Sequence, residues 1–184
     1  MNEKFTVGII VSNHFGVLNR VAGLYAKRGY NIDSLAVGET ENSAYSRMTI
    51  VSTGDEYMKN QVLRQLEKLR DVKMVGLLDK DNSVSIEHML IKLKAGDSGK
   101  AFISSLINDY SGRVMDFGGN FITAEITGSS EKIEQFIDAA RDIGILEVCR
   151  SGLISMIHGM ENVFNIEDLR DDENSNIELT INEN

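Results

Sequence analysis

The sequence of 184 residues contains no proline and a single cysteine, and each shortage narrows what the protein can be. One cysteine, Cys149, cannot form an intrachain disulfide framework. The three histidines are far apart in the sequence, with no second cysteine near any of them, so the spacing of a structural metal site is missing. Without proline, the chain also lacks one of the usual means of protecting an exposed edge strand.

Long apolar runs are equally scarce. No stretch approaches the roughly 20 apolar residues that a membrane-spanning helix needs, and the first residues lack the basic flank and cleavage site of a secretory signal. We therefore expect a cytoplasmic protein that does not contact membranes. Its 42% of apolar residues and 7% of aromatic residues are ordinary for a globular protein, so the chain should fold.

A concentrated basic surface is the third feature that the sequence lacks. The chain carries a net charge of −9, of which −7 comes from residues 161–184 and only −2 from the rest. A nearly neutral body without a basic stripe or interleaved aromatic residues does not have the electrostatic footprint of a nucleic-acid-binding protein. We interpret residues 161–184 as an acidic tail, and we expect the chain beyond about Val163 to be mobile.

The apolar residues of the first 78 positions follow two alternating periods. A period of two marks strands, whereas a period near 3.6 marks helices. The first helix is expected to end at Gly29, which follows two basic residues. The predicted elements are a strand over 5–11, a helix over 17–28, strands over 32–37 and 45–51, a helix over 58–69 and a strand over 71–77. This βαββαβ order predicts a first domain over residues 1–78.

The same order of elements begins again after the polar stretch 79–83. The predicted elements are a strand over 84–93, a helix starting near the N-cap pair Asp97–Ser98, two strands joined by a Gly118–Gly119 turn, a helix opened by Ser129, and a last strand from Ile143 that can continue to Met156. A second βαββαβ domain is therefore predicted over residues 83–160. The predicted fold class is α+β, with two tandem ferredoxin-like domains followed by the acidic tail.

Such a domain leaves part of its sheet uncovered. Both helices lie on one face of the antiparallel sheet, so the other face and two edge strands stay open. A domain of about seventy to eighty residues also buries only a modest core. We predict that the first domains of two chains associate through their 32–37 strands into one continuous sheet, so that the protein is at least a dimer.

Groups that could perform catalysis are few. Cys149 falls in an apolar stretch of a predicted strand, so we expect a buried structural thiol and not a nucleophile. His14 has no obvious partner and is expected to face solvent. The Gly118–Gly119 pair is followed by neither a phosphate-binding glycine motif nor a helix, and therefore predicts a hairpin turn. We predict no catalytic residue in this chain.

The loop between the first strand and the first helix is the best candidate for a binding site. Asn13 and Gly16 lie where the strand turns into the helix, and the free N–H groups of the first helical turn would suit a carboxylate. Both residues also have a role without any ligand, because Asn13 can close an Asx turn and Gly16 can be a helix N-cap. From these residues alone, the two interpretations are equally favoured.

Three motifs make this part of the chain resemble a known family. Residues 13–24 read Asn-x-x-Gly-Val-Leu-x-Arg-Val-x-Gly-Leu, residues 28–35 read Arg-Gly-Tyr-Asn-Ile-x-Ser-Leu, and residues 46–50 read Ser-Arg-Met-Thr-Ile. In this order and spacing they resemble the small regulatory subunit of acetolactate (acetohydroxyacid) synthase. Looser similarity through residues 65–72 and 150–152 extends the resemblance over about residues 4–158.

The resemblance implies an N-terminal ACT domain joined to a second ferredoxin-like domain. It implies a noncatalytic subunit that has no cofactor of its own. Such a subunit activates a separate large catalytic subunit that uses thiamine diphosphate, Mg²⁺ and FAD, and makes it sensitive to a branched-chain amino acid, usually valine. The implied effector site takes residues from two neighbouring chains. These are Asn13, Gly16, Val17 and Leu18 from one chain, and Asn31 and Ile32 from the other.

Two other functions stay open from the sequence. A stand-alone ACT-domain amino-acid sensor would use the same loop to act on another enzyme or regulator. A pure scaffold would bind the catalytic subunit but no amino acid. The bulky Phe15 stands in the loop where many members of the family have a proline or a small residue, and this bears on which amino acid fits.

Overall fold

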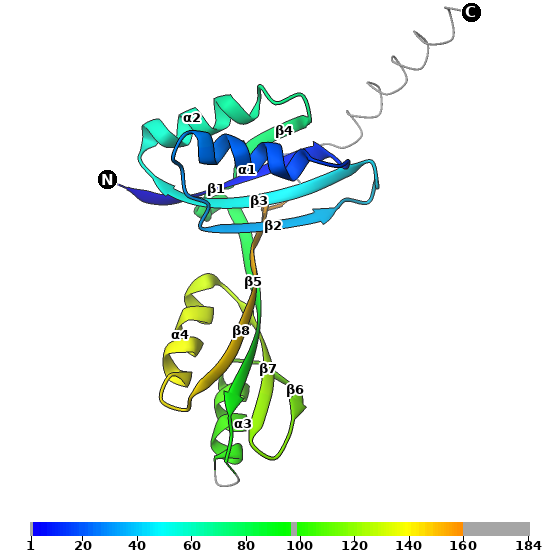
Figure 1. The fold of residues 1–184 in the computed structure, drawn as a ribbon. Coiled ribbons are helices and arrows are strands. Elements are labelled where there is room, and N and C mark those ends of the chain that lie inside the picture. The colour runs from blue at the N-terminus through cyan, green and yellow to red at the C-terminus, as the bar shows by residue number, and fades with distance from the viewer. Residues whose placement is uncertain (1, 97–98, 160–184) are drawn as a thin grey trace, which may run out of the picture. The chain divides into compact units, whose positions relative to one another are not determined.

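The computed structural model describes residues 2–96 and 99–159, and it confirms the predicted order of elements (Figure 1). The first half contains β1 (Glu3–Ser12), α1 (Val17–Lys27), β2 (Ser34–Glu39), β3 (Tyr45–Gly54), α2 (Glu56–Leu66) and β4 (Val72–Leu77). After a short 3-10 helix, η1 (Lys80–Asn82), the second half contains β5 (Ser83–Lys94), α3 (Lys100–Asp109), β6 (Arg113–Phe117), β7 (Phe121–Gly128), α4 (Ser130–Ala140) and β8 (Ile145–Ile157). The described residues divide into two compact units, the first over residues 2–33, 37–84 and 156–159, and the second over residues 34–36, 85–96 and 99–155. In the described part of the chain, no helix is both long enough and apolar enough to cross a membrane.

β1 is a central strand of the first sheet, whose order is β2-β3-β1-β4. It pairs antiparallel with β3 from Glu3↔Gly54 to Ser12↔Tyr45, and antiparallel with β4 on its other side. Apolar side chains fill both faces of β1, so the strand is buried without interruption from Val7 to Val11. The same strand order leaves β2 and β4 as the two edges of this sheet.

α1 and α2 cover one face of the first sheet (Figure 1). The buried residues of α1 are Val17, Val21 and Tyr25, which recur at helical spacing as the sequence predicts. The helix also ends where predicted. Gly29 adopts a φ of +69°, and the next N–H, that of Tyr30, turns back to the carbonyl of Tyr25 at 3.0 Å.

The second sheet repeats this topology in the order β6-β7-β5-β8. β5 and β7 pair antiparallel from Glu87↔Gly128 to Lys94↔Phe121, and alternate residues of both strands are buried against α3 and α4. The buried core of this unit includes Met89, Ile91, Leu93, Ile122, Ala124, Ile126, Ile103, Ile107, Ile133, Phe136 and Ala140. Tyr110 adds an edge-to-face ring contact with Phe136, with the ring centroids 5.2 Å apart.

Two local predictions in the second unit are confirmed. The Gly118–Gly119 turn joins β6 to β7, and the N–H of Gly118 donates to the carbonyl of Phe121 at 3.0 Å. Ser129 caps α4, since its hydroxyl accepts from the N–H of Lys132 at 3.3 Å. The predicted N-cap pair Asp97–Ser98 lies outside the described residues, and so does the predicted acidic tail over 161–184.

Cys149 is exposed, so the prediction of a buried structural thiol was wrong. The residue lies in β8, which is an edge strand of the second sheet. Glu147, two residues earlier on the same strand, forms an ion pair with Lys92 of β5 at 2.9 Å. The neighbours of Lys92 on β5 point into the core, so Lys92 itself lies on the opposite face of the sheet. Cys149 therefore shares the face of the sheet that the helices leave uncovered. The apolar neighbours of Cys149 in the sequence did not show whether its side chain lies on the helix-covered face of the sheet or on the uncovered face.

Candidate functional site

The loop over residues 12–16, between β1 and α1, is fixed by backbone hydrogen bonds on both sides. The N–H of Ser12 donates to the carbonyl of Asp71 at 2.9 Å, and the N–H of Asn13 donates to the carbonyl of Ala44 at 2.7 Å. Asp71 directly precedes β4 and Ala44 directly precedes β3, the two strands that flank β1. The loop is therefore held in place by the sheet itself.

Gly16 is the N-cap of α1, the role that it can have with or without a ligand, and it has a φ of +86°. This left-handed conformation suits glycine, and a Cβ added there would meet nothing within 4 Å. No side chain caps this end of the helix. The N–H of Val17 donates to the carbonyl of His14 at 3.5 Å, so the N–H groups of Leu18 and Asn19 are the ones that keep free hydrogen-bonding capacity. Val17 is 3% exposed and Leu18 is 45% exposed, so a ligand at the loop could reach Leu18.

The side chain of Asn13 is fixed by two acceptors on the β2–β3 hairpin. Its Nδ2 donates to Oε1 of Glu39 at 3.0 Å and to the carbonyl of Ser43 at 2.9 Å. This long-range contact, and not a local Asx turn, sets the orientation of the side chain. Because the amide nitrogen is occupied, the amide oxygen is the group that can accept from a ligand.

Asn31 follows the other end of α1 and is fixed in a similar way. Its Nδ2 donates to Oδ1 of Asp33 at 2.7 Å, and the second oxygen of Asp33 accepts from the hydroxyl of Thr53 at 2.6 Å. These contacts keep residues 31–33 in a loop. As a result, β2 begins at Ser34, two residues later than predicted.

The six predicted effector residues fall into two groups at opposite ends of α1. The groups are Asn13, Gly16, Val17 and Leu18 at its start, and Asn31 and Ile32 after its end. The helix has 11 residues, which at a rise of 1.5 Å per residue keeps the groups about 16 Å apart. An amino acid is too small to touch both groups within one chain. Their assembly from two chains stays a prediction.

His14 has partners that the sequence did not reveal. Its Nε2 lies 3.0 Å from Oδ1 of Asp71, and its Nδ1 lies 3.1 Å from the carbonyl of Phe15. The second oxygen of Asp71 pairs with Nε of Arg20 at 2.6 Å. Asp71 thus links the loop to the first turns of α1. The expectation that His14 has no partner was wrong, because its partner lies 57 residues away, in the stretch of looser family similarity over 65–72.

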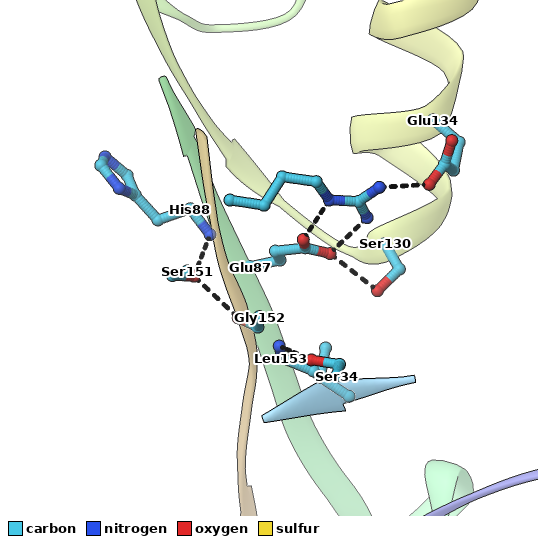
Figure 2. A network of polar contacts seen from close by, with 9 residues as sticks. Ser34, Glu87, His88, Ser130, Glu134, Ser151, Gly152 and Leu153 are labelled. Carbon is cyan, nitrogen blue, oxygen red and sulfur yellow. Dashed lines mark hydrogen bonds and ion pairs between the residues drawn. The ribbon is translucent and has the colours of Figure 1, made fainter. Parts of the chain in front are cut away.

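A second polar cluster lies in the second unit, around the carboxylate of Glu87 (Figure 2). Nε and Nη2 of Arg150 donate to its two oxygens at 2.5 and 2.8 Å, and the hydroxyl of Ser130 donates to it at 3.2 Å. The third nitrogen of Arg150 donates to Glu134 at 2.6 Å. The hydrogen bonds to Glu87 raise the pKa of Arg150. Because these groups bind one another, the cluster joins β5, β8 and α4 and serves the stability of the fold.

Comparison with known families covers both units. A family model described as "AHAS small subunit-like ACT domain" matches residues 7–74. A second one, described as "Small subunit of acetolactate synthase", matches residues 86–159. The loop over 12–16 and Asn31 lie within the first match, and the Glu87 cluster lies within the second.

Individual relatives agree with these matches. The probable acetolactate synthase small subunit of Archaeoglobus fulgidus is 40% identical over 156 residues, which cover 85% of this chain and 98% of the relative. The acetolactate synthase isozyme 3 small subunit of Escherichia coli is 36% identical over 154 residues, or 83% and 94% of the two chains. The crystal structure of the acetolactate synthase small subunit from Thermotoga maritima superposes with a TM-score of 0.81 at 34% identity, covering 86% of this chain and 99% of that one. This chain therefore belongs to the family of acetolactate synthase small subunits, and its first unit is an ACT domain.

Proposed function

We propose that this chain is the regulatory, noncatalytic subunit of acetolactate synthase in branched-chain amino acid biosynthesis. The observation that carries the proposal is that both units, and not the ACT domain alone, match small-subunit families. A small subunit implies a large one, so we propose a separate catalytic subunit in the cytoplasm as its partner. Thiamine diphosphate, Mg²⁺ and FAD would belong to that partner.

Activation is the first property to test. The purified chain alone should make no acetolactate, whereas its addition to the cognate catalytic subunit should raise the turnover of that subunit. Appreciable acetolactate formation by the isolated chain would contradict the proposal. If the chain bound valine but left the catalytic subunit unchanged, the result would favour a stand-alone sensor. Activation without a response to any branched-chain amino acid would favour a scaffold.

The loop at the start of α1 suits an amino acid as the effector. The effector's carboxylate would meet the uncapped N–H groups of the helix, and its ammonium group needs oxygen acceptors. The amide oxygens of Asn13 and Asn31 supply them, since both amide nitrogens are occupied. We propose that valine, or another branched-chain amino acid, binds between residues 13–18 of one chain and residues 31–32 of a second. The two chains would pair through the edge strand β2.

Gly16→Asp tests this site directly. The substitution would place a fixed negative charge where the effector carboxylate belongs, and a side chain where the effector must approach the backbone. Loss of a charge-assisted hydrogen bond together with the added repulsion should cost about 2–4 kcal/mol, which weakens binding roughly thirty- to a thousandfold. Inhibition by valine, leucine and isoleucine should be titrated relative to the uninhibited rate of each variant.

Gly144→Asp is the matched control for this experiment. Gly144 has a φ of +101°, so an aspartate is strained there as it is at Gly16, and the nearest atom to its added Cβ lies at an ordinary contact distance of 3.5 Å. It belongs to the second unit and has no part in the proposed effector site. Inhibition should be lost in Gly16→Asp and kept in Gly144→Asp. Equal inhibition of Gly16→Asp and the parent would show that the effector site is not this loop.

A further inference from the structure

Both asparagines of the proposed effector site are held by a carboxylate. Nδ2 of Asn13 lies 3.0 Å from Oε1 of Glu39, and Nδ2 of Asn31 lies 2.7 Å from Oδ1 of Asp33. An ionised carboxylate only accepts hydrogen bonds, so each amide must turn its NH₂ group toward the carboxylate and its oxygen away from it. The same arrangement occurs at both ends of α1, in two separate pairs of residues.

We infer that Glu39 and Asp33 are positioning residues of the effector site, which fix the amides of Asn13 and Asn31 with the oxygen toward the ligand. This inference rests on the proposed function, and it explains how the effector site would recognise the ammonium group of its ligand. An amide that is free to turn presents its NH₂ group to the effector ammonium in a part of the molecules, and those molecules cannot bind it, because two donors cannot bind each other. The fixed oxygens therefore select a ligand that carries an ammonium group. The two negative charges add a weak attraction for the same group.

The two positioning residues do not hold their partners equally. Asn13 has a second acceptor, the carbonyl of Ser43 at 2.9 Å, which keeps its amide nitrogen engaged when Glu39 is removed. The Asn31 amide, in contrast, donates to one acceptor among the described residues, the carboxylate of Asp33. The hydroxyl of Thr53 donates to the other oxygen of Asp33 and fixes that carboxylate. Removing the carboxylate of Asp33 should therefore release Asn31 fully.

The expected loss of affinity follows from the fraction of molecules that keep the right orientation. A released asparagine distributes over about three χ1 rotamers and two amide orientations, so about one sixth of the molecules stay competent to bind. Asp33→Ala should raise the valine concentration for half-inhibition about sixfold, because apparent affinity scales with this fraction. Glu39→Ala should raise it about twofold, because Ser43 still holds one N–H of the amide. Both carboxylates lie on exposed residues, so their removal leaves the core intact.

A rescue variant distinguishes orientation from a general loosening of the fold. An aspartate in place of Asn31 presents an oxygen in every orientation and needs no positioning carboxylate. Asp33→Ala combined with Asn31→Asp should therefore recover most of the affinity that Asp33→Ala loses. Glu39→Ala has no matching rescue, because an aspartate in place of Asn13 would turn a second acceptor toward the carbonyl of Ser43. A loosened loop would gain nothing from the added aspartate.

The experiment measures valine inhibition of the reconstituted enzyme, and valine binding to the full regulatory chain by isothermal titration calorimetry. The expected result is a larger loss of sensitivity in Asp33→Ala than in Glu39→Ala, with the loss in Asp33→Ala recovered by Asn31→Asp. A parent enzyme that valine, leucine and isoleucine all fail to inhibit would overturn the proposed function, and the inference with it. An inhibited parent with unchanged sensitivity in both alanine variants would overturn the inference alone. A loss in Asp33→Ala that Asn31→Asp does not recover would also overturn the inference.

Discussion

Arg150→Met should destabilise the second unit more than any other single change in the Glu87 cluster. Arg150 donates to both oxygens of Glu87, whose side chain is only 4% exposed. Methionine keeps much of the apolar stem of arginine but removes the guanidinium. The variant would therefore take from a buried carboxylate the two hydrogen bonds and the positive charge of Arg150.

The size of the effect follows from burial. Removing one partner of a fully buried ion pair costs about 3–5 kcal/mol. The side chain of Arg150 is 34% exposed, so water screens part of the interaction. We expect a loss of about 2–3 kcal/mol at neutral pH.

Hydrogen–deuterium exchange with mass spectrometry can assign this loss to the second unit. Peptides from β5 and α4 should exchange faster in Arg150→Met at pH 7, whereas peptides from β1 serve as an internal reference. Glu134→Gln is the control, because Glu134 is 55% exposed and its loss should cost less than about 0.5 kcal/mol. The double variant Glu87→Leu and Arg150→Met removes both charges and should be more stable than Arg150→Met. Equal effects of Arg150→Met and Glu134→Gln, or a double variant no more stable than Arg150→Met, would refute the reasoning.

Three further predictions concern stability and assembly. Tyr25→Phe combined with Ser52→Ala should raise the free energy of unfolding in urea by about 1 kcal/mol, because both hydroxyls are buried and neither makes a well-formed hydrogen bond among the described residues; a loss of stability would contradict this. Arg113 and His88 hydrogen-bond to Glu125 and hold its pKa below the usual range, so its stabilisation is present above roughly pH 4.3 and is lost as the pH falls through the lower folded value. Glu125→Gln should therefore lower the melting temperature at pH 7, and the difference from the parent should shrink as the pH falls below about 4.3. Sedimentation should show a dimer formed through the β2 edge, and a monomer at every protein concentration would count against that pairing.

The order of elements was predictable from the sequence because each element buries one face, and burial sets the spacing of apolar residues. Gly29, Ser129 and the Gly118–Gly119 turn were recognisable for a similar reason, since their backbone roles depend on neighbours within a few positions. The start of β2 was placed two residues too early. The side-chain contact between Asn31 and Asp33 competes there with strand formation. The alternation of apolar residues, from which the strand was predicted, carries no sign of this contact.

Contacts between distant residues could not be predicted in this way. The bond from His14 to Asp71 spans 57 residues, and the bond from Arg150 to Glu87 spans 63. Neither pair carries a local pattern, because the fold and not the spacing brings the partners together. The candidate effector residues came from family motifs, whereas the carboxylates that hold Asn13 and Asn31 became visible only in the structure.

The length of α1 makes the proposed feedback depend on the amount of protein. Its 11 residues keep the two halves of the proposed site about 16 Å apart, so a lone chain can offer an effector only half of its contacts. Effector binding and chain association are then linked equilibria, and each strengthens the other by the same factor. Valine should tighten self-association, and dilution below the dissociation constant of the dimer should weaken valine binding although no residue has changed. The pathway would thereby respond to the abundance of its regulatory subunit as well as to the concentration of its end product.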